Sequence, residues 1–252
     1  MAEPIRSQEV AEGIYRFATK WVNFYLVVDD DRGLLVDAGY PRYWKQLRPT
    51  LDAVGVGARP IDVIVTHHHV DHAGTAHRLT AEREASVFVH PADAPAVRGE
   101  RRSHVPPGFY RQAWRPSMLR YLGHTVRAGG ARYRPVPEAQ LLEPGVRPEL
   151  AGAPTVIHTP GHTAGHCSVL LADRGVLFSG DAMVNFDYAS GRHGLALHRF
   201  NEHRDQAFKS LEAFEPVDAD LMLFGHGDPW TRGVDKALET VRVQEVDRSA
   251  AH

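Results

Sequence analysis

The sequence predicts a layered α/β fold in which helices pack outside a sheet and a group of histidines lies along one edge of that sheet. Strand-helix units occur in both halves of the 252-residue chain. In each half an apolar strand also runs directly into histidine, as in "VIVTHHHVDH" and "LMLFGHGDP". Because loops that follow neighbouring strands gather at one edge of a layered structure, we expect these histidines to lie together.

The strands and helices are predicted from the spacing of apolar residues. Short β-branched and aromatic runs predict strands, and apolar residues at helical spacing, such as Trp44, Leu47 and Leu51, predict helices. We expect strands at 13–17, 22–28, 33–37, 60–66, 86–91, 153–159, 167–172 and 175–181, and a strand with its loop at 219–229. We expect helices at 42–55, 71–84, 201–216 and 233–246.

The composition limits the class of protein. The chain is 43% hydrophobic, which is enough for a sizeable core, and no linker or low-complexity tract divides it, so we expect a single domain over 1–252. No apolar run approaches the roughly 20 residues of a membrane span, and the N-terminus lacks the pattern of a secretory signal. The single cysteine, Cys167, excludes an internal disulfide framework. We therefore expect a cytoplasmic protein with no membrane partner.

Residues 98–134 form an arginine-rich segment that we expect to be an insertion of short helices. The segment has nine arginines and one acidic residue, although the whole chain has a net charge of −2. This overall balance does not indicate a nucleic-acid partner. Aromatic residues recur in the segment at helical spacing, and Pro116 is expected to split it into two helices.

Two interpretations of this segment stay open. It is either a surface helix that packs on the core or on a second subunit of a homodimer, or a lid over the site. As a lid, the segment would present an apolar wall made of Phe109, Tyr110, Trp114, Met118, Tyr121 and Leu122. Arg111 or Arg115 would contact an anionic group of a small-molecule substrate.

The run "THHHVDH" concentrates metal-binding side chains. His67 and His69 are two positions apart, so in extended backbone they point to the same side and His68 points to the other. Asp71 and His72 follow closely enough to reach a second position. Zinc takes imidazole and carboxylate ligands, usually four per ion. Candidates that follow later strands are His162, His166, Asp181 and His226.

The motifs H-x-H-x-D-H, P-G-H-T-x-G-H, S-G-D and G-H-G, in this order, resemble those of the metallo-β-lactamase-fold hydrolases over essentially the whole chain. The resemblance implies a four-layer αββα sandwich with two metal ions at one edge. It implies that Asp37 is structural and that His166 supports a loop without ligating. It assigns His67, His69 and His162 to the first metal, Asp71, His72 and His226 to the second, and Asp181 to a bridge between them.

The implied chemistry is hydrolysis at an acyl carbon. Two zinc ions would activate a bridging hydroxide and polarise a carbonyl, and the substrate would be a lactone, ester or thioester. Asp71 would orient the nucleophile and accept its proton. Manganese, iron or cobalt could occupy the same ligands.

Departures from the family pattern narrow the group that the chain resembles. Only 26 residues follow His226, which disfavours a glyoxalase II-like thioesterase. The histidine at position 69 disfavours a flavodiiron protein. The compact lactonase and esterase-like group remains, although Val184 stands where acyl-homoserine lactonases have a substrate-contacting tyrosine. Tyr188 is the candidate replacement for that tyrosine.

Several alternatives stay open. The chain could be a mono-iron persulfide dioxygenase-like enzyme, a β-lactam hydrolase, or a metal-free binding module that keeps the fold. Asp71 alone could be a helix N-cap and Asp181 a turn residue, but five correctly ordered histidines disfavour that explanation. Surface or core positions, rather than ligand positions, are expected for His68, His77, His90, His158 and His252.

Overall fold

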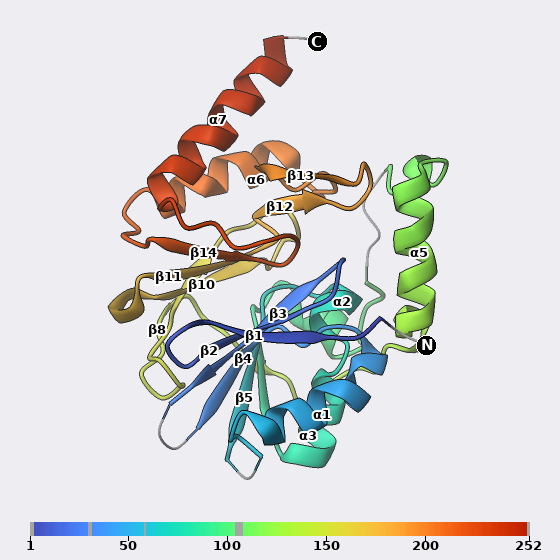
Figure 1. The fold of residues 1–252 in the computed structure, drawn as a ribbon, viewed down its shortest axis with the longest axis vertical. Coiled ribbons are helices and arrows are strands. Elements are labelled where there is room, and N and C mark those ends of the chain that lie inside the picture. Colours follow the sequence, from blue (N-terminus) through green and yellow to red (C-terminus); the bar gives the residue numbers. More distant parts are fainter. Residues whose placement is uncertain (1–2, 30–31, 58, 104–107, 251–252) are drawn as a thin grey trace.

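Two β-sheets form the centre of the molecule (Figure 1). The computed structural model describes residues 3–29, 32–57, 59–103 and 108–250. The larger sheet is antiparallel up to its fourth strand and parallel after it. Its strands, in spatial order, are β1 (Arg6–Ala11), β2 (Ile14–Ala18), β3 (Asn23–Val28), β4 (Gly33–Val36), β5 (Ile61–Val65), β6 (Ser86–Val89) and β7 (Gln140–Leu141).

The smaller sheet comes from the second half of the chain. Its strands, in spatial order, are β14 (Leu221–Phe224), β11 (Val176–Gly180), β10 (Cys167–Leu171), β9 (Thr155–His158) and β8 (Gly145–Val146). β11 and β14 are parallel, and the other pairs are antiparallel. A separate hairpin of β12 (Met183–Asp187) and β13 (Arg192–Leu197) follows β11.

Side-chain alternation along the strands gives each sheet two buried faces. In β3, Val27 points toward the smaller sheet and packs in the same apolar cluster as Val169 of β10. Its neighbour Leu26 points the other way and packs in the cluster that contains Leu47. The smaller sheet buries its outer face in a third cluster. Because both faces of both sheets are apolar, each outer face needs a covering layer.

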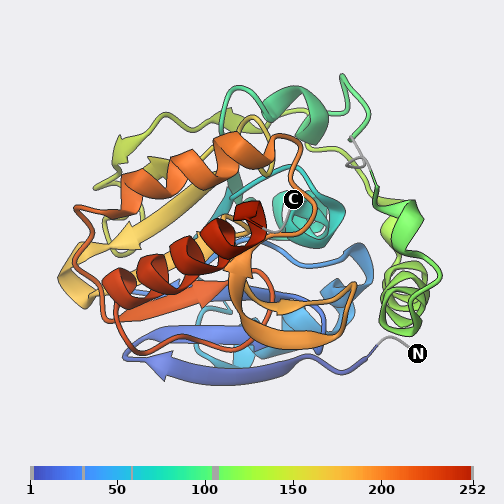
Figure 2. The ribbon, with the colours of Figure 1, turned by 90° about the horizontal axis from the view of Figure 1, so that it is seen from above.

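Helices supply these two outer layers. α1 (Trp44–Ala53) and α3 (Ala76–Arg83) cover the larger sheet, and α6 (Arg204–Ser210) and α7 (Val234–Ala250) cover the smaller one (Figure 1). Figure 2 shows α6 and α7 lying across the smaller sheet. The predicted four-layer αββα sandwich with a helical insertion is confirmed. Within the described residues, no helix combines the length and the apolar character that crossing a bilayer needs.

The prediction of one helix over 71–84 is wrong. The chain forms α2 (Val70–Ala73) and then α3, with Gly74 between them. An ideal Cβ on Gly74 would lie 2.4 Å from the carbonyl oxygen of Gly39 and 2.5 Å from Pro41, so only glycine permits this close packing. The sequence analysis also missed β1, β7, β8 and the β12–β13 hairpin.

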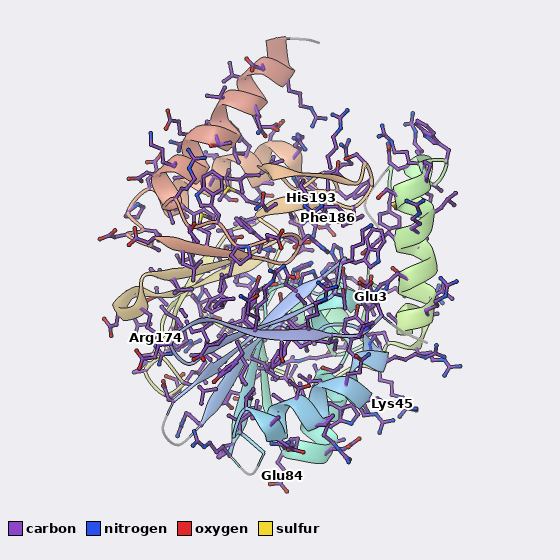
Figure 3. All side chains as sticks on the ribbon, viewed as in Figure 1. Glu3, Lys45, Glu84, Arg174, Phe186 and His193 are labelled. Carbon is purple, nitrogen blue, oxygen red and sulfur yellow. The ribbon has the colours of Figure 1, made fainter. Side chains whose placement is uncertain are left out.

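The arginine-rich segment contains α5 (Pro116–Ala128), which stands beside the sandwich (Figure 2). A short 3₁₀ helix (Tyr110–Gln112) precedes Pro116, which is the first residue of α5, where proline is favourable. The prediction that Pro116 divides the segment into two helices is therefore confirmed. Met118 and Tyr121 face inward and pack with Trp21 and with Phe186 of the hairpin. Figure 3 labels Phe186 and shows it on the hairpin. Residues 104–107 of the segment lie outside the described part.

Candidate metal centre

The candidate metal centre lies where strands of both sheets end at a common edge. The loop after β5 carries His67, Asp181 directly follows β11, and His226 lies just beyond the end of β14. The loop between β9 and β10 carries His162. Gly225 permits the convergence, because a Cβ at that position would lie 2.2 Å from the Asp181 carboxylate.

Three histidines form a first cluster. The Nε2 atom of His67 lies 3.0 Å from Nδ1 of His69, and Nε2 of His162 lies 3.1 Å from the same Nδ1. The rings of His67 and His162 are buried. His68 points away from the cluster, as the alternation of an extended backbone predicts.

Asp71, His72 and His226 form a second cluster, and Asp181 lies between the two clusters. The Nε2 atoms of His72 and His226 each lie 3.8 Å from Asp71 Oδ2. Asp181 Oδ2 lies 3.1 Å from His226 Nε2 and 3.4 Å from His162 Nε2, so it faces a member of each cluster. The structure therefore brings all seven predicted ligands together.

The donor atoms fit metal ions. The ring nitrogens of the first cluster are 3.0–3.1 Å apart, close to the roughly 3.3 Å that tetrahedral zinc with bonds of about 2.0–2.1 Å would impose. Among the described residues, His72 Nε2 and Asp181 Oδ1 are buried and have no hydrogen-bond partner. Buried polar atoms without partners are costly, and cations between the clusters would satisfy them.

Asp37 orients two of the histidine rings. His72 donates its Nδ1 proton to Asp37 Oδ2 at 2.7 Å. The Thr66 hydroxyl donates to Asp37 at 2.9 Å, so its oxygen is left to accept from His67 Nδ1 at 3.0 Å. Asp37 has a φ of 67°, in the left-handed region that side chains other than glycine seldom adopt. With Nδ1 engaged, both rings present the Nε2 lone pair to the cluster.

His162 and His226 are oriented in the same way by partners far away in the sequence. His162 Nδ1 lies 3.2 Å from the Oδ1 atom of Asn201. The amide nitrogen of Asn201 donates to the carbonyl of His198, which identifies Oδ1 as the acceptor for His162. His226 donates its Nδ1 proton to the carbonyl of Trp21. Sequence reasoning missed Asn201 and Trp21 as partners.

The electrostatics of the two clusters differ. Burial lowers the pKa of His69 to about 3, and burial also holds the pKa of His67 well below its ordinary value. Burial acts in the same direction on His72, but the carboxylate of Asp37 and two further carboxylates raise its pKa to about 10. The carboxylates around His72 thus favour a positive charge in the second cluster, whereas burial favours neutral rings in the first.

Two further buried histidines are not arranged as ligands. His166 accepts the backbone N–H of Asp181 at Nε2, 2.9 Å away, and thereby supports the loop that carries the bridging residue. Its Nδ1 contacts the Thr159 hydroxyl. His68 contacts the carboxylate of Asp93 at 3.0 Å. Asp93 also accepts hydrogen bonds from the Thr163 hydroxyl and the N–H of Gly165.

His198 is a buried residue of the site that sequence reasoning missed. It directly follows β13, and its Nε2 lies 3.5 Å from Asp181 Oδ2. Its ring lies 4.3 Å from that of His162, centroid to centroid. The signal that could have revealed it is a histidine just past a strand, as at His67 and His226. The strand itself was missed, so this signal went unused.

A cavity of about 280 Å³ opens onto the metal centre. Asp71, His162, Asp181 and His226 lie at its base, and Tyr188 lines it. Ser103, Thr125 and two further tyrosines, Tyr40 and Tyr110, also line it. The mainly apolar part of the lining consists of Val70, Phe109, Tyr121, Leu122 and Phe200.

α5 contacts the metal centre through its inner face. The Tyr121 hydroxyl donates to Asp71 Oδ2 at 3.1 Å, and its ring stacks on that of Tyr188 at 4.0 Å. The predicted substrate residues Arg111, Trp114 and Arg115 lie elsewhere. None of the three lines the cavity, and 73% of Trp114 is exposed. Of the side chains expected to form the apolar wall, Phe109, Tyr110, Tyr121 and Leu122 line the cavity, whereas Trp114 does not.

Comparisons with known proteins agree with this geometry. The sequence profile described as the metallo-beta-lactamase superfamily matches residues 22–226. The chain is 24% identical over 246 residues to the probable metallo-hydrolase YflN of Bacillus subtilis (strain 168), covering 88% of this chain and 87% of that protein. It is 33% identical over 172 residues to the acyl-coenzyme A thioesterase MBLAC2 of Gallus gallus, covering 65% of this chain and 58% of that protein.

A solved structure is also similar. A metallo-beta-lactamase family protein from Thermus thermophilus superposes with a TM-score of 0.70 at 24% identity, covering 96% of this chain and 82% of that one.

Proposed function

Because this chain belongs to the metallo-β-lactamase superfamily, we propose that it is a hydrolase that uses two zinc ions to cleave an ester, thioester or lactone. One observation carries the proposal. The two buried clusters flank a single carboxylate, Asp181, and the cavity opens directly onto both of them. Zinc bound there would supply an activated water and a Lewis acid for the substrate carbonyl.

The side chains around the clusters have separate roles in this reaction. Asp71 accepts the proton of the attacking water, and the hydrogen bond from Tyr121 at 3.1 Å holds its carboxylate in place. Tyr188 keeps its proton at neutral pH, because burial raises its pKa well above the ordinary value. Its hydroxyl is therefore available to donate a hydrogen bond to the substrate. This assigns to Tyr188 the role that a tyrosine at position 184 would otherwise have.

The cavity suits an apolar acyl group. Val70, Phe109, Leu122 and Phe200 line it, and burial of apolar surface contributes about 25 cal/mol per Å² to binding. An acyl chain would occupy this part of the cavity with its carbonyl directed toward Asp181.

Within the three substrate classes we favour a thioester with an anionic leaving group. The relative that is 33% identical is named as an acyl-coenzyme A thioesterase. The arginine-rich segment carries nine arginines and one acidic residue, and Phe109, Tyr121 and Leu122 within it line the cavity. Positive charge beside a cavity attracts anionic substrates.

The test is a substrate panel on zinc-loaded protein whose metal content has been measured. The panel contains acyl-coenzyme A thioesters, neutral thioesters, lactones, aryl esters, a β-lactam and glutathione persulfide. Hydrolysis of thioesters or esters by protein with two zinc ions, abolished by a chelator and restored by zinc, would support the proposal. Persulfide oxidation with iron, β-lactam cleavage alone, or at most one metal per chain would overturn it.

A further inference from the structure

His198 contacts the metal centre but differs from the predicted ligands in its hydrogen bonding. Its side chain is 3% exposed, and its Nε2 lies 3.5 Å from Asp181 Oδ2. We infer that His198 is a positioning residue, which donates its Nε2 proton to the carboxylate shared by the two clusters and binds no metal. The part of this inference that concerns turnover rests on the proposed function, and the part that concerns metal binding does not.

The hydrogen bond at the other ring nitrogen identifies the donor. The backbone N–H of Phe200 donates to His198 Nδ1 at 3.0 Å, so Nδ1 carries no proton. A neutral imidazole has one N–H, and that proton must then be on Nε2. A protonated Nε2 has no lone pair for a metal ion, but it can donate to a carboxylate.

His162, the nearest ring, shows the opposite arrangement. Its Nδ1 donates to Asn201 Oδ1 at 3.2 Å, which leaves the Nε2 lone pair for a metal ion. Asn201 connects the two histidines, because its amide nitrogen donates to the carbonyl of His198 at 2.9 Å. Asn201 thus helps to orient the ring of His162, a predicted metal ligand, and to hold the backbone of His198, the inferred proton donor.

The backbone around His198 is held firmly. Its carbonyl accepts from Asn201 and also from Arg204 at 3.3 Å, and Arg204 pairs with Glu245 of α7 at 2.5 Å. The ring lies against those of His162 and Tyr188. The ring therefore cannot turn its Nδ1 toward the metals without losing the hydrogen bond from Phe200.

Asp181 needs such a donor. Five imidazole Nε2 atoms lie within 4.0 Å of its Oδ2, and the three nearest are those of His226 at 3.1 Å, His162 at 3.4 Å and His198 at 3.5 Å. His226 and His162 direct lone pairs toward the metal positions, and only His198 among the three presents a proton. The inferred donation from His198 Nε2 across this 3.5 Å contact orients the carboxylate. Such outer contacts to metal ligands change affinity or activity by roughly 10–100-fold.

Two substitutions separate a donor from a ligand. His198→Gln places an amide N–H near the position of Nε2, and His198→Met has similar bulk and no N–H. We expect both variants to bind two zinc ions per chain by elemental analysis. Competition with a chelator should show affinity for the more weakly held zinc falling roughly 10–100-fold in His198→Met and returning to within about threefold of the wild type in His198→Gln. His162→Ala, which removes a ligand, should bind less than two zinc ions.

These outcomes are independent of the substrate. Loss of one zinc ion from both His198 variants would show that His198 is a ligand. Wild-type zinc affinity in His198→Met would show that it has no role, and equal weakening in both variants would show a merely structural one. Each of these results overturns the inference. If protein with two bound zinc ions hydrolyses no substrate of the panel, the proposed function is overturned. The zinc affinities of the His198 variants still decide the inference about His198.

A measurement on the unsubstituted protein covers the case in which a variant fails to fold. Long-range ¹H–¹⁵N correlation spectra of the zinc-loaded protein report which ring nitrogen of each histidine carries the proton. We expect the proton of His198 on Nε2, and a zinc-bound Nε2 with a protonated Nδ1 for His162. A proton on Nδ1 of His198 would overturn the inference.

Discussion

The metal centre and α5 lie next to each other, yet the chain holds their side chains in different ways. At the metal centre, hydrogen bonds fix the outward-facing nitrogens of His67, His72, His162 and His226. On α5 the inner face also makes hydrogen bonds, such as that from Tyr121 to Asp71 and that between His124 and Tyr43, but the outer face is exposed, with 71% of Val126 accessible. Substitutions at the metal centre should therefore strongly reduce zinc binding or activity, because several contacts are lost together. Substitutions on the outer face of α5 should have small effects.

The largest effect is expected at Asp71. Asp71→Asn should lower kcat by roughly 10²–10⁴-fold, because an amide cannot accept the proton of the attacking water. The zinc content should change much less than the activity. Steady-state kinetics and elemental analysis on the same preparation measure both.

The controls for Asp71 test the register of the histidine motif. His69→Ala should lose zinc, and His68→Ala should keep it, because His68 contacts Asp93 instead of the clusters. Loss of zinc from His68→Ala but not from His69→Ala would show that the motif has been assigned wrongly.

A smaller effect is expected at Asp37, which orients His72 and, through Thr66, His67. Asp37→Asn should weaken zinc binding by roughly 10–100-fold. Asparagine tolerates the left-handed backbone of this position, so the effect reports the lost charge instead of strain. Calorimetric titration with zinc measures it. The exposed substitution Asp205→Asn is the matched control, and equal affinities in the two variants would contradict the role of Asp37.

Asp93 should affect stability instead of metal binding. Hydrogen bonds from His68, Thr163 and Gly165 outweigh burial and lower the pKa of its carboxyl. This stabilisation is fully present above the unfolded-state pKa of about 3.9 and is lost as the pH falls through the folded-state value. Asp93→Asn should reduce the free energy of unfolding by about 1–2 kcal/mol at pH 7.

Urea unfolding of metal-free protein measures this difference. The gap between wild type and Asp93→Asn should stay constant from pH 7 to pH 5 and shrink below about pH 4. A difference in unfolding free energy that grows as the pH falls would contradict the lowered pKa of Asp93.

The smallest effect is expected on the outer face of the arginine-rich segment. Combined Arg111→Ala and Arg115→Ala should raise KM for an anionic thioester by roughly two- to fivefold, as expected for charges that attract the substrate without contacting it, with kcat unchanged. The increase should disappear at high salt and be absent for a neutral thioester. A much larger change would place these arginines in contact with the substrate and restore the lid interpretation.

The sequence predicted well which side chains gather at the candidate metal centre, because their signals are local. Alternation in extended backbone separates His67 and His69 from His68, and each later candidate directly follows a strand. It predicted α5 less well. The spacing grouped Trp114 with Tyr121, but Pro116 begins a new helix between them, so the two side chains do not share one continuous apolar face.

By itself the sequence determined most of the strands and helices and the set of candidate ligands, because these depend on neighbouring residues and short spacings. The four-layer sandwich was implied by the resemblance of its motifs to those of a known family. The tertiary structure decided which ring nitrogens face the metals. His226 depends on the carbonyl of Trp21, 205 residues away, and His72 depends on Asp37, 35 residues away. It also decided that Tyr121 reaches Asp71 and that His198 joins the site. Hydrogen bonds act over about 3 Å in space whatever the separation along the chain, so only the folded backbone brings these partners together.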